Sequence, residues 1–355
     1  MTGTQPLRAR RSRRGDRVPR AAAAGPGTPR WSPLLVGVAA ITGLAAVAFT
    51  VLALVDDEVV TGADRWVKPW KFAVSIAVYV GTVAWMVRLV RVHRRTAVVA
   101  GGVAAGALLV ELVVIAGQAT RGTTSHFNED TPVDAALFSV MGLAIVLVWL
   151  ATVVLAFVLL REAVGGAGLA TGLHWGLGIA AFAMLSGMLM IDPVNEWLLA
   201  ATGSPPADGS GAHTVGAADG GPGLPVLGWS TTVGDLRVGH FVGLHALQAL
   251  PLLGFLLDRA GRWSAGTRRT LVRTAGAGWL GLVLLVLAQA VRAEPLVRPG
   301  LLTSGAVLVL ALGLGAAVLT TLRNDAAARD GVARTDTAAR DDAVRTDPED
   351  RAGAR

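Results

Sequence analysis

The chain has no cysteine among its 355 residues. Disulfide bonds, thiolate metal ligands and a cysteine nucleophile are therefore excluded. Charged residues are scarce as well, since they make up 16% of the chain against about a quarter of an ordinary soluble domain. The sequence also has no P-loop, no G-x-S-x-G elbow and no H-E-x-x-H motif. Nucleotide hydrolysis and the common hydrolase signatures consequently have no support.

Long apolar runs dominate what the sequence does contain. Hydrophobic residues make up 53% of the chain, and its mean hydropathy is +0.55. Several uninterrupted runs reach the ~20 residues that an α-helix needs to cross a bilayer. We therefore predict an all-α membrane protein, a bundle of about eight transmembrane helices whose immediate partner is the lipid bilayer. The predicted spans are 34–55, 72–90, 97–117, 135–160, 173–191, 238–257, 271–290 and 301–322.

The distribution of arginines along the chain predicts which ends of the spans face the cytoplasm. Residues 1–30 hold eight arginines against one aspartate, and further arginines follow the second, fourth and sixth predicted spans. Cytoplasmic connections carry the excess of basic residues in membrane proteins. We therefore expect the N-terminus and the C-terminus to be cytoplasmic. The basic arm suits anionic lipid headgroups, and we expect no nucleic-acid partner.

Composition divides the chain into three regions. Residues 1–30 should be a disordered basic cytoplasmic arm, and 31–322 the eight-span transmembrane domain. Residues 323–355 alternate arginine and aspartate, which predicts a disordered cytoplasmic tail. Within the domain, the outer loop 192–234 is rich in glycine and proline. It is either a mobile linker or a lid that folds back over the bundle.

One stretch, residues 234–248, carries an unusual set of polar side chains into an apolar span: Asp235, Arg237, His240, His245 and Gln248. At 100° per residue, the last four of these share one side of a helix. Polar groups at this depth are costly unless they find a partner. We therefore expect a polar site at the outer end of this span.

Further polar residues belong to the same outer end. Lys68 and Lys71 begin the second span on one helical face, and Glu111 lies about two turns inside the third. Arg121 and His126 follow in the next connection. An intramembrane carboxyl should face the bundle interior, where it either pairs with a cation or stays protonated. These residues therefore complete the candidate site.

The residue types indicate a division of roles. His126, His240 and His245 are the candidate ligands of a metal ion or haem. Asp235 and Glu111 are the candidate catalytic acid–base groups. The candidate groups for holding an anionic small molecule or lipid are Lys68, Lys71, Arg121, Arg237 and Gln248. His240 and His245 are five residues apart, not four, so one unstrained helix does not present both to one metal.

Two alternatives stay open beside a metal- or haem-binding protein. The first is a transporter or sensor of a small solute, in which Glu111 and the histidines bind protons or ligand. The second is a membrane assembly factor, in which the polar cluster is an inter-helical hydrogen-bond network. The sequence does not decide whether the protein is an enzyme, and it specifies neither a cargo nor an oligomeric state.

Three strings carry a family resemblance: residues 66–72, 121–128 and 234–248. They resemble a group of bacterial polytopic membrane proteins of unknown function, over roughly residues 34–260. The resemblance implies a multi-pass protein of the bacterial cytoplasmic (inner) membrane. It implies nothing about the chemistry of the site.

Overall fold

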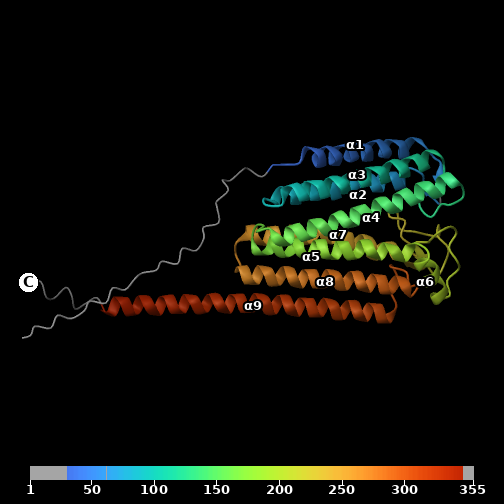
Figure 1. The fold of residues 1–355 in the computed structure, drawn as a ribbon. Coiled ribbons are helices and arrows are strands. Elements are labelled where there is room, and N and C mark those ends of the chain that lie inside the picture. The colour runs from blue at the N-terminus through green and yellow to red at the C-terminus, as the bar shows by residue number, and fades with distance from the viewer. Residues whose placement is uncertain (1–29, 61, 347–355) are drawn as a thin grey trace, which may run out of the picture. The chain divides into compact units, whose positions relative to one another are not determined.

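The computed structural model describes residues 30–60 and 62–346. Nearly all of this part of the chain is helical (Figure 1). The helices are α1 (Pro33–Val55), α2 (Val67–Leu89), α3 (Arg94–Thr120), α4 (Pro132–Arg161), α5 (Ala167–Ser186), α6 (Val194–Thr202), α7 (Leu236–Ala260), α8 (Ala265–Val291) and α9 (Leu301–Thr346), with a 3-10 helix η1 (Gly187–Met190) after α5. Four strands of two residues each form two small antiparallel pairs: β1 (Val59–Val60) with β2 (Ala63–Asp64), and β3 (Thr214–Val215) with β4 (Gly234–Asp235).

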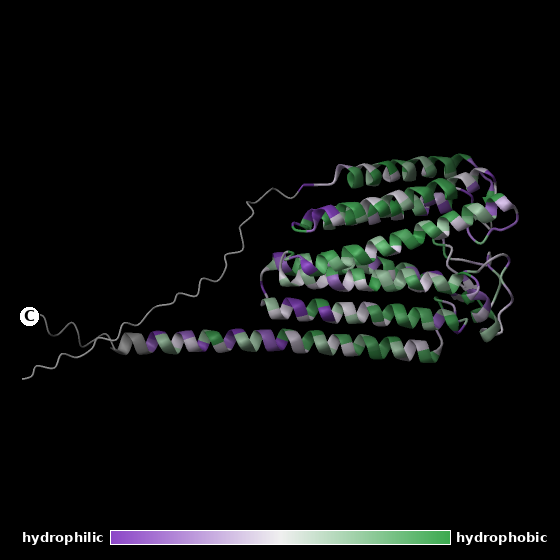
Figure 2. Cartoon of the chain, viewed as in Figure 1, coloured by the Kyte–Doolittle hydropathy of each residue, from purple (hydrophilic) through white to green (hydrophobic). Residues whose placement is uncertain are grey.

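Within the described residues, eight helices are long and apolar enough to cross a membrane, and they follow the eight predicted spans in order. Hydrophobic residues fill their middles, and hydrophilic residues gather at their ends (Figure 2). Only α6 is too short to span; it belongs to the long connection between α5 and α7. The prediction of an all-α fold with eight helices able to cross a membrane is thus confirmed for the described residues.

Successive spanning helices alternate in direction, so their connections collect at two ends (Figure 1). The loop-rich end contains the connections after α1, α3, α5 and α8. The arginine-rich end contains the short connections after α2, α4 and α7. At the loop-rich end, α2 begins at Val67, five residues before the predicted start, and so brings Lys68 and Lys71 onto its first two turns.

Helices α5 and α7 pack most closely. An added methyl at Gly172 of α5 would lie 2.2 Å from the carbonyl oxygen of Leu250, and one at Gly254 of α7 would lie 2.2 Å from that of Gly168. Glycine at such positions lets two membrane helices approach backbone to backbone, which van der Waals packing requires where lipid is as apolar as the core. Because α5 and α7 pack so closely, α5 determines the position of the N-terminal end of α7.

At the arginine-rich end, three acidic side chains bond to the start of another helix or to the turn before it. Glu162, which follows α4, binds the turn before α3, Asp258 of α7 caps α5, and Asp325 of α9 binds the start of α8. The donors are the amides of Arg91, Val92 and His93 for Glu162, those of Gly168 and Leu169 for Asp258, and the Ser264 amide with the Thr267 hydroxyl for Asp325. An anion at a helix N-terminus satisfies amides that have no helical acceptor. These acids are structural.

The structure differs from the sequence prediction at the C-terminal region. Helix α9 continues to Thr346, whereas an irregular tail was expected from residue 323. Its polar half places aspartates four residues before arginines, an order that stabilises helices, and Arg329 lies 2.7 Å from Asp325. Residues 347–355 of the expected tail, and residues 1–29 of the expected basic arm, lie outside the described residues.

Candidate functional site

The segment between η1 and α7 is a folded cover on the loop-rich end. Strand β3 pairs with β4, which immediately precedes α7. Two basic side chains of the bundle bond to the cover: Lys71 donates to the Leu227 carbonyl at 3.2 Å, and Arg237 donates to the Gly228 carbonyl at 2.6 Å. The two alternatives for residues 192–234 were a mobile linker and a lid. In this structure the segment folds back over the bundle.

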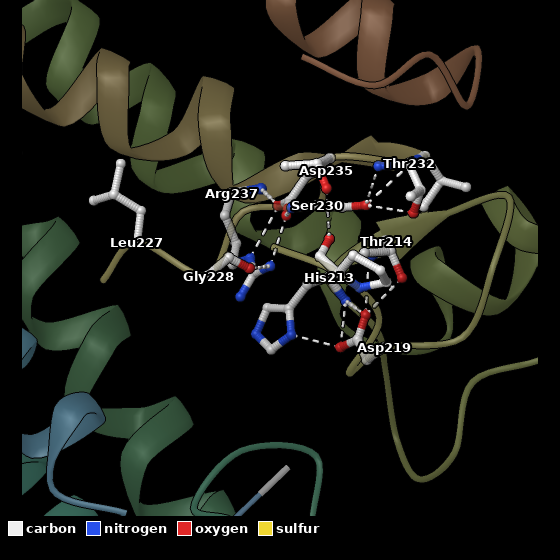
Figure 3. A network of polar contacts seen from close by, with 12 residues as sticks. His213, Thr214, Asp219, Leu227, Gly228, Ser230, Thr232, Asp235 and Arg237 are labelled. Atoms are coloured by element: carbon white, nitrogen blue, oxygen red, sulfur yellow. Dashed lines mark hydrogen bonds and ion pairs between the residues drawn. The ribbon is translucent and has the colours of Figure 1, made fainter. Parts of the chain in front are cut away.

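Asp235 accepts several hydrogen bonds in this region (Figure 3). Its side chain is buried and caps α7 by accepting from the Arg237 amide at 3.0 Å. It also accepts from the Arg237 guanidinium at 2.9 and 2.6 Å and from the Ser230 amide at 2.7 Å. Both oxygens are therefore engaged in joining the cover to α7, which makes Asp235 and Arg237 structural groups in this conformation.

Arg121 is engaged in a similar way. Its guanidinium lies 2.6 Å from Asp134 and 2.5 Å from the side-chain oxygen of Gln118. Asp134 also accepts from Gln118 at 2.8 Å and from the Thr131 hydroxyl at 2.5 Å. This network closes the connection between α3 and α4, while the Arg121 side chain stays 44% exposed.

The structure adds a histidine–aspartate pair that the sequence analysis did not single out. Nδ1 of His213 lies 2.5 Å from Oδ2 of Asp219, and Asp219 also accepts from the amides of His213 and Thr214 (Figure 3). Burial opposes ionisation of Asp219, but the bonds from His213 and Thr214 outweigh it and hold its pKa well below the usual range. Because an ionised Asp219 only accepts, we infer that Nδ1 of His213 donates.

The imidazole of His213 is itself mostly neutral. Burial lowers its pKa from the usual value, although Asp219 acts in the opposite direction. In the neutral ring with a proton on Nδ1, Nε2 is an acceptor. No hydrogen bond to Nε2 occurs within the described residues, so this nitrogen is open to a proton donor.

His126 lies close by in an aromatic cage. The centroid of its ring is 5.7 Å from that of Phe72, 6.2 Å from that of Phe127 and 6.3 Å from that of Phe138. Its Nδ1 lies 3.1 Å from the hydroxyl of Ser125. Burial lowers its pKa well below the usual value, and the positive charge of Lys68 adds to the effect. His126 is therefore neutral at physiological pH.

Lys68 lies on the first turn of α2 at the loop-rich end. After burial, its positive charge contributes to the lowered pKa values of His126 and His213. The side chain is partly buried, and no described acceptor forms a hydrogen bond with it.

Glu111 is the innermost member and is unlike the other acids. Its side chain on α3 has 0% exposure, and neither oxygen has a hydrogen-bond partner within the described residues. An unpaired polar group costs free energy in a membrane interior. Burying the Glu111 carboxyl without hydrogen-bond donors therefore costs the fold free energy.

The three predicted metal ligands are not brought together. His240 donates from Nδ1 to the Ala183 carbonyl of α5 at 2.7 Å, and His245, further along α7, is exposed on the outside of the bundle. His126 lies in its aromatic cage. Across the described chain, no group of three or more His, Cys, Asp or Glu side chains has metal-binding geometry. The five-residue spacing explains the divergence of His240 and His245, because it turns them about 140° apart.

Gln248 is the last of the predicted site residues. It lies on α7, and its side-chain oxygen is buried without a hydrogen-bond partner in the described structure. No contact joins it to Lys68 or Glu111. The candidate cluster therefore comprises His126 and the His213–Asp219 pair, since both histidine rings lie against Phe127, with Lys68 and Glu111 on the neighbouring helices α2 and α3.

Comparison with known proteins identifies no relative. No protein-family model, curated protein or solved structure matches the chain. The resemblance to a bacterial membrane family therefore stays an expectation, and the function has to be argued from the cluster itself.

Proposed function

We propose that this protein couples the transport or sensing of a small solute to proton binding at Glu111. The observation that carries the proposal is the buried carboxyl of Glu111, which has no hydrogen-bond donor among the described residues. Lys68, on the neighbouring helix α2, is the cation that we expect to pair with it. Such a carboxyl avoids an unpaired charge in two ways: it holds a proton, or it pairs with the ammonium. Exchange between these states binds or releases a proton as Lys68 moves.

The surrounding geometry favours this function over a structural one. Asp235 and Asp134, on the same end of the bundle, have full sets of donors and hold loops in place. Glu111 joins no such network, so it contributes little to holding the fold. Ionisable groups inside a membrane domain that stabilise nothing commonly mark a proton or ion pathway.

The metal- or haem-binding alternative has less support, because His126, His240 and His245 do not converge. The assembly-factor alternative requires an inter-helical network that satisfies its own members. Glu111 and Gln248 both leave buried oxygens unsatisfied in the described residues. Proton-coupled binding explains the unsatisfied carboxyl of Glu111, whereas a static network does not.

We further propose that the loop-rich end faces away from the cytoplasm of a bacterial cell. The arginine-rich end carries Arg91, Arg94, Arg95, Arg161, Arg259 and Arg262. Basic connections are retained on the cytoplasmic side of inner-membrane proteins. In that orientation, Lys68 and the cover meet the extracytoplasmic solution, and a small-molecule ligand would arrive from there.

The test uses the full chain in liposomes that contain a pH-sensitive dye, with a pH gradient imposed and the membrane potential clamped. We expect Glu111→Gln to abolish any proton flux of the wild type. Glu129→Gln is the matched control, because Glu129 is exposed at the same end. The flux of that variant should equal that of the wild type.

A sensor would titrate Glu111 without transporting protons. The infrared band of a protonated carboxyl, compared between acidic and alkaline pH, detects such a titration. A band that changes with pH and is lost in Glu111→Gln, without flux, assigns the protein to sensing. If the wild type shows neither flux nor a Glu111 band that changes with pH, the proposed function is wrong.

A further inference from the structure

We propose that Arg269 and Arg273 of α8 bind the phosphate of an anionic phospholipid at the arginine-rich end of the bundle. Both residues are exposed, and neither side chain forms a hydrogen bond or an ion pair with a described residue. The inference concerns the outer surface of the helices. It is therefore independent of the proton binding proposed for Glu111.

The two arginines lie on one face of α8, about one turn apart. They are four residues apart within a helix that runs Ala265–Val291, so they differ by about 40° around its axis and about 6 Å along it. Like charges at this spacing repel each other. The preceding Arg268 has its counter-charge, since it lies 3.3 Å from Asp258. Arg269 and Arg273 have no described acid, so an anion from outside the protein would relieve their repulsion.

This face of α8 is turned away from the other helices. Ala277 and Leu284 continue it at about 40° and 20° from Arg273, and both are exposed, Leu284 by 48%. Helix α9 lies on another side, because an added methyl at Gly278, about 140° from Arg273, would lie 2.5 Å from the Leu314 side chain. In a bilayer, the arginine face of α8 therefore meets lipid.

Arg273 also lies deep within its helix. It follows Ala265 by eight residues, which is about 12 Å along the axis, whereas each headgroup layer of a bilayer is only about 5–8 Å thick. Arginines inside spanning helices usually face the bundle interior and pair there. Arg273 does neither among the described residues. Its charge needs a counter-ion, and a lipid phosphate is the anion that a bilayer supplies next to the ends of its helices.

The surface beside the arginines is suited to acyl chains. Helix α5 packs against α8 here, since an added methyl at Gly276 would lie 2.5 Å from the Trp175 ring. Phe182 follows Trp175 by seven residues, lies on the same face of α5, and is 38% exposed. Toward the middle of the bundle, Leu284 is exposed on α8. A phosphate bound to the arginines would thus direct its acyl chains onto apolar side chains, which favours a lipid over a soluble phosphate.

The chemistry of the guanidinium group favours an anionic lipid among the phospholipids. Each guanidinium presents a planar set of donors that matches two oxygens of a phosphate. Two such groups about 6 Å apart along α8 can bind one phosphodiester from two sides. The headgroup of phosphatidylcholine carries a positive charge that both arginines repel, whereas that of phosphatidylglycerol carries none. We therefore expect the site to select phosphatidylglycerol.

The experiment measures lipid binding to the full-length protein in detergent. Phosphatidylglycerol or phosphatidylcholine with the same acyl chains is titrated in, and native mass spectrometry counts the bound lipid. We expect Arg269→Gln or Arg273→Gln to weaken phosphatidylglycerol binding about fivefold, because this is the contribution of one basic residue near an anionic headgroup. The double variant should lose about twenty-fivefold and should no longer prefer phosphatidylglycerol.

Three controls separate the site from general surface charge and from misfolding. Arg95→Gln is the matched variant, since Arg95 is exposed at the same end but on α3; it should bind phosphatidylglycerol as the wild type does. Thermal unfolding without added lipid should be the same in all variants, because the two side chains contact no acceptor. Inorganic phosphate at the concentration of the lipid should not displace it.

Equal affinity of the wild type for the two lipids overturns the proposal. An equal loss in Arg95→Gln and Arg273→Gln also overturns it, since binding then reflects the charge of the whole end. Displacement by inorganic phosphate would show a site for a soluble anion instead of a lipid. A variant that unfolds at a lower temperature without lipid would show that its arginine is structural, which contradicts an unpaired pair on the surface.

Discussion

Two buried carboxyl groups near the same end of the bundle have opposite surroundings. Asp235 is 2% exposed and accepts from the amide and guanidinium of Arg237 and from the Ser230 amide. Glu111 is 0% exposed and accepts from none of the described residues. Burial is thus nearly equal, and only the supply of donors differs. A carboxylate with every lone pair engaged holds structure in place, whereas one without donors is free to change its protonation state.

The largest loss of stability should come from neutralising Asp235, the carboxyl that has hydrogen-bond donors. Asp235→Asn leaves the Arg237 guanidinium, whose side chain is 21% exposed, without its counter-charge. We expect the free energy of unfolding to fall by about 3 kcal/mol, as when one partner of a buried pair is removed. Thermal unfolding of the detergent-solubilised protein measures the change, with Glu129→Gln as the exposed control. A loss below about 1 kcal/mol would remove the distinction between the two carboxyls.

Acid should weaken the cover before it weakens the arginine-rich end. The pKa values of His126 and His213 are lowered, so each gives stability above the unfolded pKa of about 6.5, and this stability is lost as the pH falls below it. Asp219 and Glu162 also have lowered pKa values, so their contributions persist until the pH falls below about 4. Hydrogen exchange at pH 7 and at about pH 5 should show faster exchange in residues 204–234, with little change in residues 90–93. Equal acceleration at both ends would contradict this account.

The unbonded carboxyl should be nearly dispensable for stability. Glu111→Gln replaces a side chain that has no donors, so we expect the free energy of unfolding to change by less than about 1 kcal/mol. The same unfolding assay as for Asp235→Asn makes the comparison direct. If this variant is as unstable as Asp235→Asn, Glu111 is held in a permanent ion pair and the contrast is false.

The smallest effect concerns the attachment of the cover. Lys71→Gln shortens the side chain that donates to the Leu227 carbonyl at 3.2 Å. One exposed hydrogen bond contributes about 0.5–1 kcal/mol, so hydrogen exchange near residue 227 should quicken slightly while global stability is preserved. Exchange that quickens across the whole loop-rich end would show that Lys71 holds more than this one contact.

The sequence was sufficient to predict the eight spans because length and hydropathy determine them. It also placed Glu111 correctly in the bundle interior, since the cost of a lipid-facing carboxyl leaves no other position. The C-terminal half of α9 was missed because its composition suggested disorder, although Asp325 and Arg329 have helical spacing. In that segment the order of the charges is more informative than their abundance.

The site was only partly predictable, for reasons of geometry. His245 is on the expected helix, but it follows His240 by five residues, and this spacing turns its side chain outward. His213 and Asp219 lie in a glycine-rich stretch whose composition resembles a linker. Their pairing depends on β3 meeting β4, a contact that no local pattern encodes. Lys68 was expected to hold a substrate, and the described structure shows no hydrogen-bond acceptor for it.

The central claim is that the buried carboxyl of Glu111 exchanges a proton. The infrared difference spectrum of the full-length protein in lipid, recorded between acidic and alkaline pH, tests it most directly. We predict a carboxyl band that appears on acidification, that is lost in Glu111→Gln and that persists in the matched Glu129→Gln control. A spectrum identical in wild type and Glu111→Gln would show that Glu111 never changes its protonation state and would contradict the account.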